Sequence, residues 1–441
     1  MLERCLSAVN ADLYKYQKVG VYHILKHRYF LLGDEQGLGK TLQAIAVIAG
    51  TGVKTVVVCP GSLRGNWKRE IEKFTDLKAD IVWSSNHVIK KGYDVLVVSY
   101  DLFDLVQPEL GFKAIILDEC QYIKNVTSKR SKLIHEFVFL AKPTYCIGLS
   151  GTPITNNTAE FYSILKLLSY CPVRTNGIPL AEKSHYAFSA KFCYVEDKTF
   201  DVRKTDGTSV SVTTQDFSGV KNLSRLKKYL KGKYIRRLAK DQLDLPPLIE
   251  KGVFLDDKTH HELDAKLKVA FEDWLASGHG MGEHNTQLKI QAAMAKVPHT
   301  CELAVSLLSE GEKVVIFTDH VEPCKAILST LQEHEVRCGV ITGRTPQKQR
   351  QTLIDRFQTG PLEVLICSIR AASTGITLTA AKNLIFNDLS WVPADMEQAK
   401  KRIHRIGQTS TCVVSRMLLG SMDERISNRL MEKIEVLRKV L

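Results

Sequence analysis

Two short stretches of the sequence carry residue types suited to phosphate chemistry, and "GDEQGLGKT" is the first of them. It follows an apolar run, precedes a helical pattern and ends in Lys40 and Thr41. A phosphate-binding loop needs inward-turned backbone N–H groups at a helix N-terminus, a lysine for the outer phosphates and a hydroxyl for magnesium. Gly37 and Gly39 supply the curvature, whereas Asp34 stands where the strict GxxxxGK[ST] pattern has its first glycine. The alternative is a glycine-rich turn that only caps a helix.

The second stretch is "ILDECQYIKN", in which Asp118 and Glu119 end an apolar run. Adjacent acids on an exposed turn are common and can serve solubility alone. Downstream of a Lys–Thr loop, however, the first carboxylate can orient magnesium through its water shell, and the second can polarise an attacking water. The pair therefore indicates a magnesium–nucleotide site with Glu119 as its base.

A third stretch, "QAKKRIHRIGQ", places Arg402 and Arg405 three residues apart. On a helix these side chains share one face. Such an arginine pair can stabilise the charge that develops on a γ-phosphate. The alternative is a basic helix face without a ligand.

The elements that must position these residues follow a repeated pattern of strand and helix. "TVVVCP", "DVLVVSY", "AIILDE" and "YCIGLSG" are continuous apolar runs, which is typical of strands buried on both faces. Helical patterns between them predict βαβ units and a parallel sheet. The same pattern restarts with "KVVIFTD", "RCGVITG", "EVLICS" and "NLIFND". The fold class is therefore α/β, with two similar parallel-sheet lobes.

Composition shifts divide the chain further. The middle turns polar around "KTDGTSVSVTTQDFSG", then basic, and "LDLPPL" is typical of a linker. We expect a first lobe over 1–170, a mainly helical insertion with a small hairpin over 171–242, a linker over 243–255, a second lobe over 256–425 and a terminal helix over 426–441.

The formal net charge of +13 is consistent with a polyanionic partner, and ordinary solubility is the alternative. Residues 221–240 hold nine Lys or Arg and no acid, which indicates a phosphate-facing surface or a hinge. Eleven scattered cysteines without a CxxC pair argue against structural zinc and disulfides. No segment offers the roughly 18 consecutive apolar residues of a membrane span. The first residues lack the basic start and apolar block of a secretory signal, so we do not expect one.

The stretches above run in the order and spacing of a known family. "LYKYQ", "GDEQGLGKT", "VVVCPGSLRGNWKREIEKF", "VLVVSYD", "ILDECQYIKN", "LSGTPITNN", "VVIFTD" and "STGITLTAAKNLIFNDLSWVPADMEQAKKRIHRIGQ" resemble the motifs of the Swi/Snf family of ATP-driven double-stranded DNA translocases, in helicase superfamily two. The segment "FSGVKNLSRLKKYLKGKYIRRLAKDQLDLPP" is similar to the lobe junction of the branch that remodels replication forks and reanneals strands. The resemblance implies two RecA-like lobes joined by the linker, with ATP and Mg²⁺ as ligands.

The resemblance also implies roles for single residues. The residues expected to contact the nucleotide are Gln17, Asp34, Gly37, Gly39, Lys40, Thr41 and Gly375, and those expected to hold the metal are Thr41 and Asp118. Catalysis is expected from Lys40, Asp118, Glu119, Arg402 and Arg405, and coupling of the ATP state to lobe movement from Ser150, Gly151, Thr152 and Gln398. The residues expected to contact DNA are Pro60, Ser62, Lys124, Asn125 and Gly343. Two positions depart from the family pattern: Gln121 replaces a histidine, and Val392 replaces an asparagine.

These features predict a DNA-dependent ATPase that remodels DNA by fork reversal, branch migration or strand annealing, or that remodels protein–DNA complexes. A strand-separating DNA or RNA helicase and a non-hydrolysing nucleic-acid-binding scaffold are the alternatives. We expect a monomeric motor on double-stranded or branched DNA, with no membrane partner. Its expected location is the cytoplasm of a bacterial or phage-infected cell, or the nucleus of a eukaryotic one.

Overall fold

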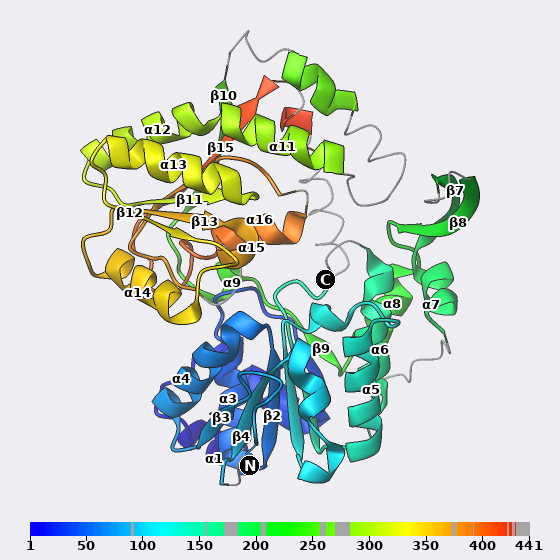
Figure 1. The fold of residues 1–441 in the computed structure, drawn as a ribbon. Helices are drawn as coiled ribbons and strands as arrows, with labels where there is room; N and C mark the ends of the chain where they lie inside the picture. The colour runs from blue at the N-terminus through cyan, green and yellow to red at the C-terminus, as the bar shows by residue number, and fades with distance from the viewer. Residues whose placement is uncertain are drawn as a thin grey trace. The chain divides into compact units, whose positions relative to one another are not determined.

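A computed structural model gives the arrangement of the chain. It describes residues 1–89, 92–154, 157–171, 184–203, 209–255, 262–269, 283–372, 376–390, 392–420, 423–425 and 428. The chain divides into two compact units (Figure 1): the first comprises residues 1–195, 217–243 and 437–441, and the second comprises residues 196–216 and 244–436.

The first unit is built on a seven-stranded sheet in the order β3-β4-β2-β5-β6-β1-β9. Its strands are β1 (Tyr29–Leu32), β2 (Thr55–Cys59), β3 (Ala79–Ile81), β4 (Val95–Ser99), β5 (Ala114–Asp118), β6 (Tyr145–Leu149) and β9 (Tyr234–Ile235). Every pairing is parallel. The continuous apolar runs thus form the parallel strands that the sequence predicts.

Both faces of this sheet are covered by apolar side chains. In β2, for example, Val57 packs in one core cluster, while Val56 and Val58 pack in the other. Successive side chains of a strand point to opposite faces, so a strand needs apolar residues at every position when both faces are buried. This requirement explains why the runs are continuous rather than alternating.

Helices supply the cover on the two faces. The first unit contains α1 (Leu2–Ser7), α2 (Lys15–His27), α3 (Lys40–Thr51), α4 (Arg64–Phe74), α5 (Lys129–Ala141), α6 (Phe161–Ser169), α7 (His185–Phe192), α8 (Leu223–Leu230) and α9 (Ala239–Gln242), with 3-10 turns at Gly61–Leu63, Tyr100–Leu105, Pro108–Leu110, Cys120–Ile123 and Thr158–Glu160. Residues of α3 and α4 pack in one core cluster and residues of α5 and α6 in the other, so the two pairs of helices cover opposite faces of the sheet (Figure 1).

The insertion, expected to be mainly helical with a small hairpin, does contain the hairpin, and its two ten-residue strands make the segment mixed rather than mainly helical. Beside α7 and α8 it contains β7 (Tyr194–Arg203) and β8 (Ser209–Ser218), which pair in a two-stranded sheet. The physical reason is the run of Val, Thr and Phe on either side of "TDG", a composition that favours a hairpin over a helix. The end of the same segment, β9, joins the edge of the first sheet beside β1.

The second unit contains a six-stranded sheet in the order β10-β15-β14-β11-β13-β12, and its pairings are parallel as well. Its strands are β10 (Leu248–Leu255), β11 (Val314–Thr318), β12 (Cys338–Ile341), β13 (Val364–Ser368), β14 (Asn383–Phe386) and β15 (Cys412–Leu419), and its helices are α11 (Glu283–Ala295), α12 (Val297–Ser309), α13 (Val321–Glu333), α14 (Gln347–Gln358), α15 (Ile369–Ala372) and α16 (Pro393–Lys400).

Strand β10 corrects the expected linker over 243–255. The chain from Leu248 onward is an edge strand that pairs with β15 along its whole length. Its residues are all half-buried or exposed, which suits an edge position. Of the expected terminal helix over 426–441, all but residue 428 lies outside the described residues.

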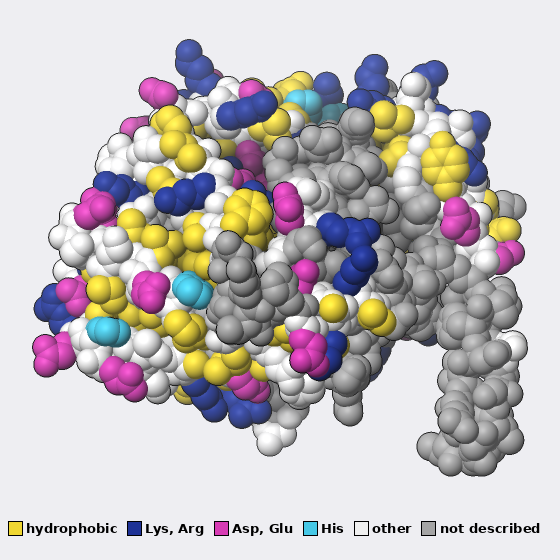
Figure 2. Space-filling model, turned by 90° about the horizontal axis from the view of Figure 1, so that it is seen from above, with side chains coloured by type: hydrophobic (Ala, Val, Ile, Leu, Met, Phe, Trp, Pro, Cys, Tyr) yellow, Lys and Arg dark blue, Asp and Glu magenta, His cyan; other side chains and the backbone are white. Residues whose placement is uncertain are grey.

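Three expectations concern the chain as a whole. None of the described helices is both long and apolar enough to cross a bilayer. The eleven cysteines are free thiols, and most of them are buried. On the face drawn in Figure 2, the described Lys and Arg side chains lie among Asp and Glu side chains rather than in one block, so the positive excess does not form a single patch on that face.

Candidate nucleotide-binding site

The predicted catalytic residues of the first unit follow strands that end at one edge of its sheet. The phosphate loop follows β1, the acidic pair ends β5, and Ser150 follows β6. These three strands are neighbours in the order β5-β6-β1 and run in parallel, so their carboxyl ends lie side by side. In parallel α/β sheets, ligands bind at this edge. The fold therefore brings the lysine and the acidic pair together, as the sequence predicts.

The loop after β1 has the backbone of a phosphate-binding turn. Gly37 and Gly39 have φ values of 87° and 68°, which L side chains rarely adopt. Helix α3 begins at Lys40, so its N-terminal N–H groups and positive dipole end face the loop. Thr41 lies in the first turn of the helix, where the resemblance places a metal-side hydroxyl.

The Lys40 ammonium lies inside the loop. Its Nζ donates to the backbone oxygens of Asp34 at 2.7 Å and Glu35 at 3.3 Å. Burial lowers the pKa of Lys40, and the nearby carboxylates of Glu119, Asp34 and Asp118 oppose that shift. A lysine in this position can exchange its carbonyl contacts for the oxygens of a phosphate.

Gln17, the predicted adenine reader, bridges helix α2 and the loop. Its Oε1 accepts from the Tyr14 backbone N–H at 2.9 Å, and its Nε2 donates to the Leu38 carbonyl at 3.2 Å. The side chain is almost fully buried. The structure therefore places Gln17 against the loop, and its contact with adenine stays a prediction.

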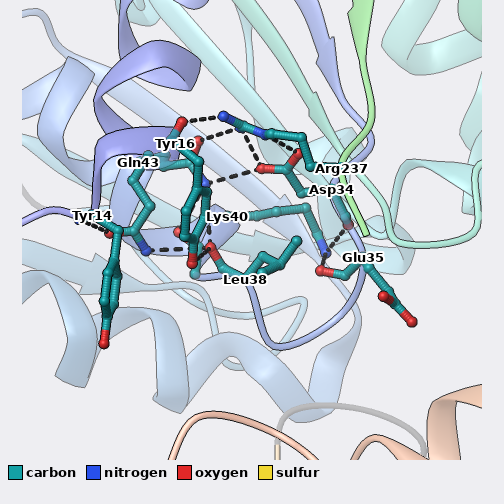
Figure 3. A network of polar contacts seen from close by, with 10 residues as sticks. Tyr14, Tyr16, Asp34, Glu35, Leu38, Lys40, Gln43 and Arg237 are labelled. Carbon is teal, nitrogen blue, oxygen red and sulfur yellow. Dashed lines mark hydrogen bonds and ion pairs between the residues drawn. The ribbon is translucent and has the colours of Figure 1, made fainter. Parts of the chain in front are cut away.

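Asp34 has a different position from the one expected of a nucleotide contact (Figure 3). Its carboxylate is fully buried and accepts from Arg237 Nε at 2.8 Å and Nη2 at 2.5 Å. Gln43 Nε2 donates to the same carboxylate at 3.2 Å. The Asp34 side chain is thus part of the internal support of the loop, and its backbone carbonyl faces Lys40. The reason is the neighbouring guanidinium, which the sequence separates from Asp34 by 203 positions.

The acidic pair at the end of β5 is held by several hydrogen bonds. Trp67 Nε1 donates to Asp118 Oδ2 at 2.7 Å, and the Glu119 backbone N–H donates to Asp118 Oδ1 at 3.0 Å. Burial, followed by repulsion from Glu119, raises the pKa of Asp118 to about 7. Glu119 has φ 51°, an uncommon left-handed conformation for a non-glycine residue. Such conformations concentrate at functional sites because the surroundings must hold them in place.

Gln121 extends this pair to the loop after β6. Its Nε2 donates to Glu119 Oε2 at 2.7 Å, and its Oε1 accepts from Ser150 Oγ at 2.7 Å. Ser150 Oγ also accepts from the Thr152 backbone N–H at 3.0 Å. The glutamine in place of the family histidine therefore forms a hydrogen-bonded connection within the first unit, between Glu119 and Ser150.

The residues present fit a nucleotide and its metal. At the site, Gln36 is buried and neither polar atom of its amide has a hydrogen-bond partner among the described residues. A cation bound beside Asp118 and Glu119 would relieve the repulsion that raises the Asp118 pKa. Thr41 and Asp118 are the residues that would face Mg²⁺, and the Lys40 ammonium and the loop N–H groups would face phosphate.

The predicted DNA contacts are distributed over several loops. Lys124 Nζ lies 2.7 Å from Glu160 Oε1, and Asn125 Oδ1 accepts from the Thr127 backbone N–H and hydroxyl in a local turn. Pro60 is buried and precedes the 3-10 turn that holds the half-buried Ser62. Gly343, in the second unit, is exposed, with open space where a Cβ would stand. Their contacts with DNA stay a prediction.

The arginine pair of the second unit does not lie on a helix. Helix α16 ends at Lys400, and both arginines follow it in turns. Arg402 Nη1 and Arg405 Nη1 nevertheless donate to the same Ile376 carbonyl, at 3.4 Å and 3.3 Å. The prediction that the two arginines share a helix face is therefore wrong, and the cause is physical. Gln408 donates to the carbonyls of Ile403 at 3.1 Å and of residues 379 and 381, so the chain after α16 turns back toward the loop that contains Ile376.

Two further predictions concern residues near these arginines. Gln398 is buried on α16, and Gly375 lies outside the described residues. The action of Arg402 and Arg405 on a γ-phosphate therefore stays a prediction.

Sequence reasoning missed the arginines that support the site from residues 234–239. Arg237 contacts Asp34, and Arg236 Nη1 lies 3.4 Å from the Gly151 carbonyl. The basic run 221–240 predicted a phosphate-facing surface or a hinge. Several of its basic residues are exposed, but Lys233 is buried, and burial lowers its pKa. The available signal was the Tyr–Ile pair directly before the two arginines, which is typical of a short strand.

Comparisons with known proteins agree with the geometry. The sequence matches the SNF2-related domain over residues 16–290 and the helicase conserved C-terminal domain over residues 295–407. It is 28% identical over 97% of its length to the mouse "DNA annealing helicase and endonuclease ZRANB3", and covers 40% of that protein. It is 29% identical over 98% of its length to the Xenopus tropicalis "SWI/SNF-related matrix-associated actin-dependent regulator of chromatin subfamily A-like protein 1", and covers 45% of it.

Among solved structures, the "Sulfolobus solfataricus SWI2/SNF2 ATPase core in complex with dsDNA" is similar, with 25% sequence identity, a TM-score of 0.44, and coverage of 98% of this chain and 94% of that one. The chain spans less than half the length of the two relatives named above. Because the SNF2-related match alone covers more than half of the sequence, this chain belongs to the SNF2-related family.

Proposed function

We propose that this chain is a DNA-dependent ATPase that moves along or remodels double-stranded or branched DNA. The proposal rests on one observation: Lys40, Asp118 and Glu119 lie together at the carboxyl edge of one parallel sheet, in a chain of the SNF2-related family. Its similarity to an annealing helicase and to a SWI/SNF-related protein supports DNA as the partner.

Each side chain has a defined task in this proposal. The loop N–H groups and Lys40 bind the phosphates of ATP, and Thr41 and Asp118 hold Mg²⁺, which neutralises phosphate charge when bound. Glu119 accepts a proton from, or orients, the attacking water. The Glu119–Gln121–Ser150 connection then links that water to the loop after β6.

The finer parts of the proposal concern the substrate. Fork reversal, branch migration and strand annealing are the expected reactions, and they are proposed for this chain from its relatives. As part of the same proposal, the chain acts as a monomer, in the cytoplasm of a bacterial or phage-infected cell or in the nucleus of a eukaryotic one.

The test is ATP hydrolysis measured without DNA and with duplex, fork, four-way junction and single-stranded DNA. We expect duplex or branched DNA to stimulate hydrolysis, because in this proposal the ATP site closes only when the protein also contacts the phosphates of DNA. Lys40→Ala and Glu119→Gln should lower turnover by on the order of a hundredfold or more. Glu119→Gln should retain ATP binding, since the loop and Lys40 are unchanged.

Two exposed residues of α5 provide matched controls. Lys132→Ala and Glu136→Gln make the same chemical changes away from the site and should leave turnover unchanged. Hydrolysis without any stimulation by DNA would favour the scaffold alternative. Unwinding of forked DNA without annealing or branch migration would favour the strand-separating helicase.

A further inference from the structure

The chain that precedes the boundary between the two units runs alongside β1 and the phosphate loop. The Leu31, Gly33 and Glu35 backbone N–H groups donate to the carbonyls of Lys233 at 2.7 Å, Ile235 at 2.8 Å and Arg237 at 2.9 Å. This ladder continues past the end of β1 into the loop itself. The segment 233–239 is thus an additional strand-like wall of the nucleotide site.

Space at this wall is restricted. A Cβ at Gly33 would overlap the ring of Tyr234, so glycine is needed where the two segments pass each other. Further along, Glu35 Oε2 accepts from the Ala239 backbone N–H at 2.6 Å, which secures the far end of the segment to the loop.

Arg237 is the main side-chain contact between the segment and the loop. Its guanidinium forms two parallel hydrogen bonds with Asp34, contacts the Tyr16 carbonyl and donates to Gln43 Oε1 at 3.2 Å. The guanidinium also lies over the Tyr16 ring, 5.3 Å from its centroid. Paired hydrogen bonds of this kind fix orientation as well as distance, and a lysine cannot reproduce them.

The consequence for the site comes through the backbone of Asp34. Arg237 holds the side chain of this residue, while the carbonyl of the same residue accepts from the Lys40 ammonium (Figure 3). Gln43, on α3, contacts both members of the ion pair. A change in the position of Asp34 therefore displaces the lysine that is to bind phosphate.

We propose that Arg237 is a positioning residue for ATP binding, acting through Asp34 on the phosphate loop and Lys40. This inference rests on the proposed function. It differs from a catalytic role, because the hydrogen-bonding groups of the guanidinium are occupied by Asp34, Gln43 and the Tyr16 carbonyl. It predicts a change in nucleotide affinity rather than in the chemical step.

The test is the dissociation constant of a fluorescent ATP analogue, together with KM and kcat for DNA-stimulated hydrolysis. Arg237→Ala should weaken nucleotide binding and raise KM by on the order of 10-fold to 100-fold, with a much smaller change in kcat. Arg237→Lys keeps the charge without the paired geometry and should give an intermediate KM. DNA affinity without nucleotide should be unchanged.

Asp34→Asn keeps the size of the side chain and guards against a folding defect in the alanine variant. It should raise KM in the same direction, and its effect should be small in an Arg237→Ala background, because both changes remove one pair. Arg69→Ala, at an exposed arginine of α4, is the matched control and should bind ATP like the wild type.

Two results separate the possible failures. Unchanged nucleotide affinity in folded Arg237→Ala and Arg237→Lys, beside a wild type that binds ATP, would overturn the role of Arg237 alone. A fall in kcat at constant KM would also overturn it. Absence of ATP binding by the wild type would instead overturn the proposed function.

Discussion

Gln121 shows how one residue type changes the chemistry that a site can perform. It receives a hydrogen bond from Ser150 and donates one to Glu119, so it connects two loops without a titratable group. A histidine at this position could also carry a proton, whereas an amide has fixed donors and acceptors. We infer that hydrolysis in this chain is linked to the loop after β6 through orientation rather than through proton transfer.

Gln121→Leu removes both hydrogen bonds at similar volume. We expect DNA-stimulated kcat to fall by about tenfold, because Glu119 loses the contact that orients it, while ATP affinity is retained. Steady-state hydrolysis and nucleotide binding measured on the same preparation give the two quantities. Gln121→His should retain most activity, and a wild-type kcat in the leucine variant would show that the connection is not used.

At the scale of elements, a half-buried histidine joins α5 to α6. His135 Nε2 lies 3.1 Å from Ser163 Oγ, and its Nδ1 lies 3.3 Å from the Tyr170 hydroxyl. Burial, and then the nearby Lys166 ammonium, lowers the pKa of His135 to about 4. The contact between these helices is therefore made by a neutral imidazole.

This neutral histidine predicts a dependence of stability on pH. Between pH 6.5 and about 4, the unfolded chain binds a proton at His135 that the folded chain does not. The stabilisation is therefore complete above pH 6.5, the pKa of this histidine in the unfolded chain, and it decreases as the pH falls through this window. At roughly 1.4 kcal/mol per pKa unit, the difference between 6.5 and about 4 corresponds to a total loss of about 3.5 kcal/mol.

Chemical denaturation at several pH values measures this effect. His135→Asn should show a shallower decrease of the free energy of unfolding between pH 7 and 4 than the wild type. His334→Asn, at an exposed histidine, should keep the wild-type slope. Equal slopes in all three proteins would contradict the assignment to His135.

The second departure from the family pattern, Val392, lies at the start of α16. Val392 is the N-cap residue of this helix and offers no side-chain acceptor to its first N–H groups. Asparagine is among the best N-cap residues. Val392→Asn should therefore stabilise the second unit by about 1 kcal/mol and raise its melting temperature by about 2–4 °C. Val392→Ala serves as the control in a thermal scan, and a lower melting temperature in the asparagine variant would contradict the capping argument.

At the scale of the whole molecule, each unit has its own pair of apolar cores, one on each face of its sheet. In the second unit, Phe317 and Phe386 stack with centroids 5.8 Å apart and lie in one core cluster. The core clusters of the described residues contain members of one unit only. A core defect should therefore remain local to its unit.

Phe386→Ala tests this separation. Loss of a buried phenylalanine costs about 3–5 kcal/mol, including the cavity that it leaves. Hydrogen exchange should accelerate in β11, β13 and β14, while the strands of the first sheet keep wild-type protection. Accelerated exchange in both sheets would show that the units unfold together.

Sequence patterns predicted the parallel strands and the loop that begins at Gly33, because both are local. A strand buried on two faces needs an unbroken apolar run, and a phosphate loop needs glycines beside a helix start. The same reasoning located Lys40 and the Asp118–Glu119 pair, since residues at the carboxyl ends of neighbouring parallel strands must share one edge.

Pairings between distant segments could not be read from such patterns. The sequence alone indicated which residues could bind phosphate. It assigned Asp34 to the nucleotide, however, and it left residues 221–240 as either a phosphate-facing surface or a hinge. Only the tertiary structure placed Arg237 on Asp34 and β9 beside β1. The physical reason is that a buried carboxylate must find an opposite charge or a donor wherever the fold supplies one, and separation along the chain does not limit that choice.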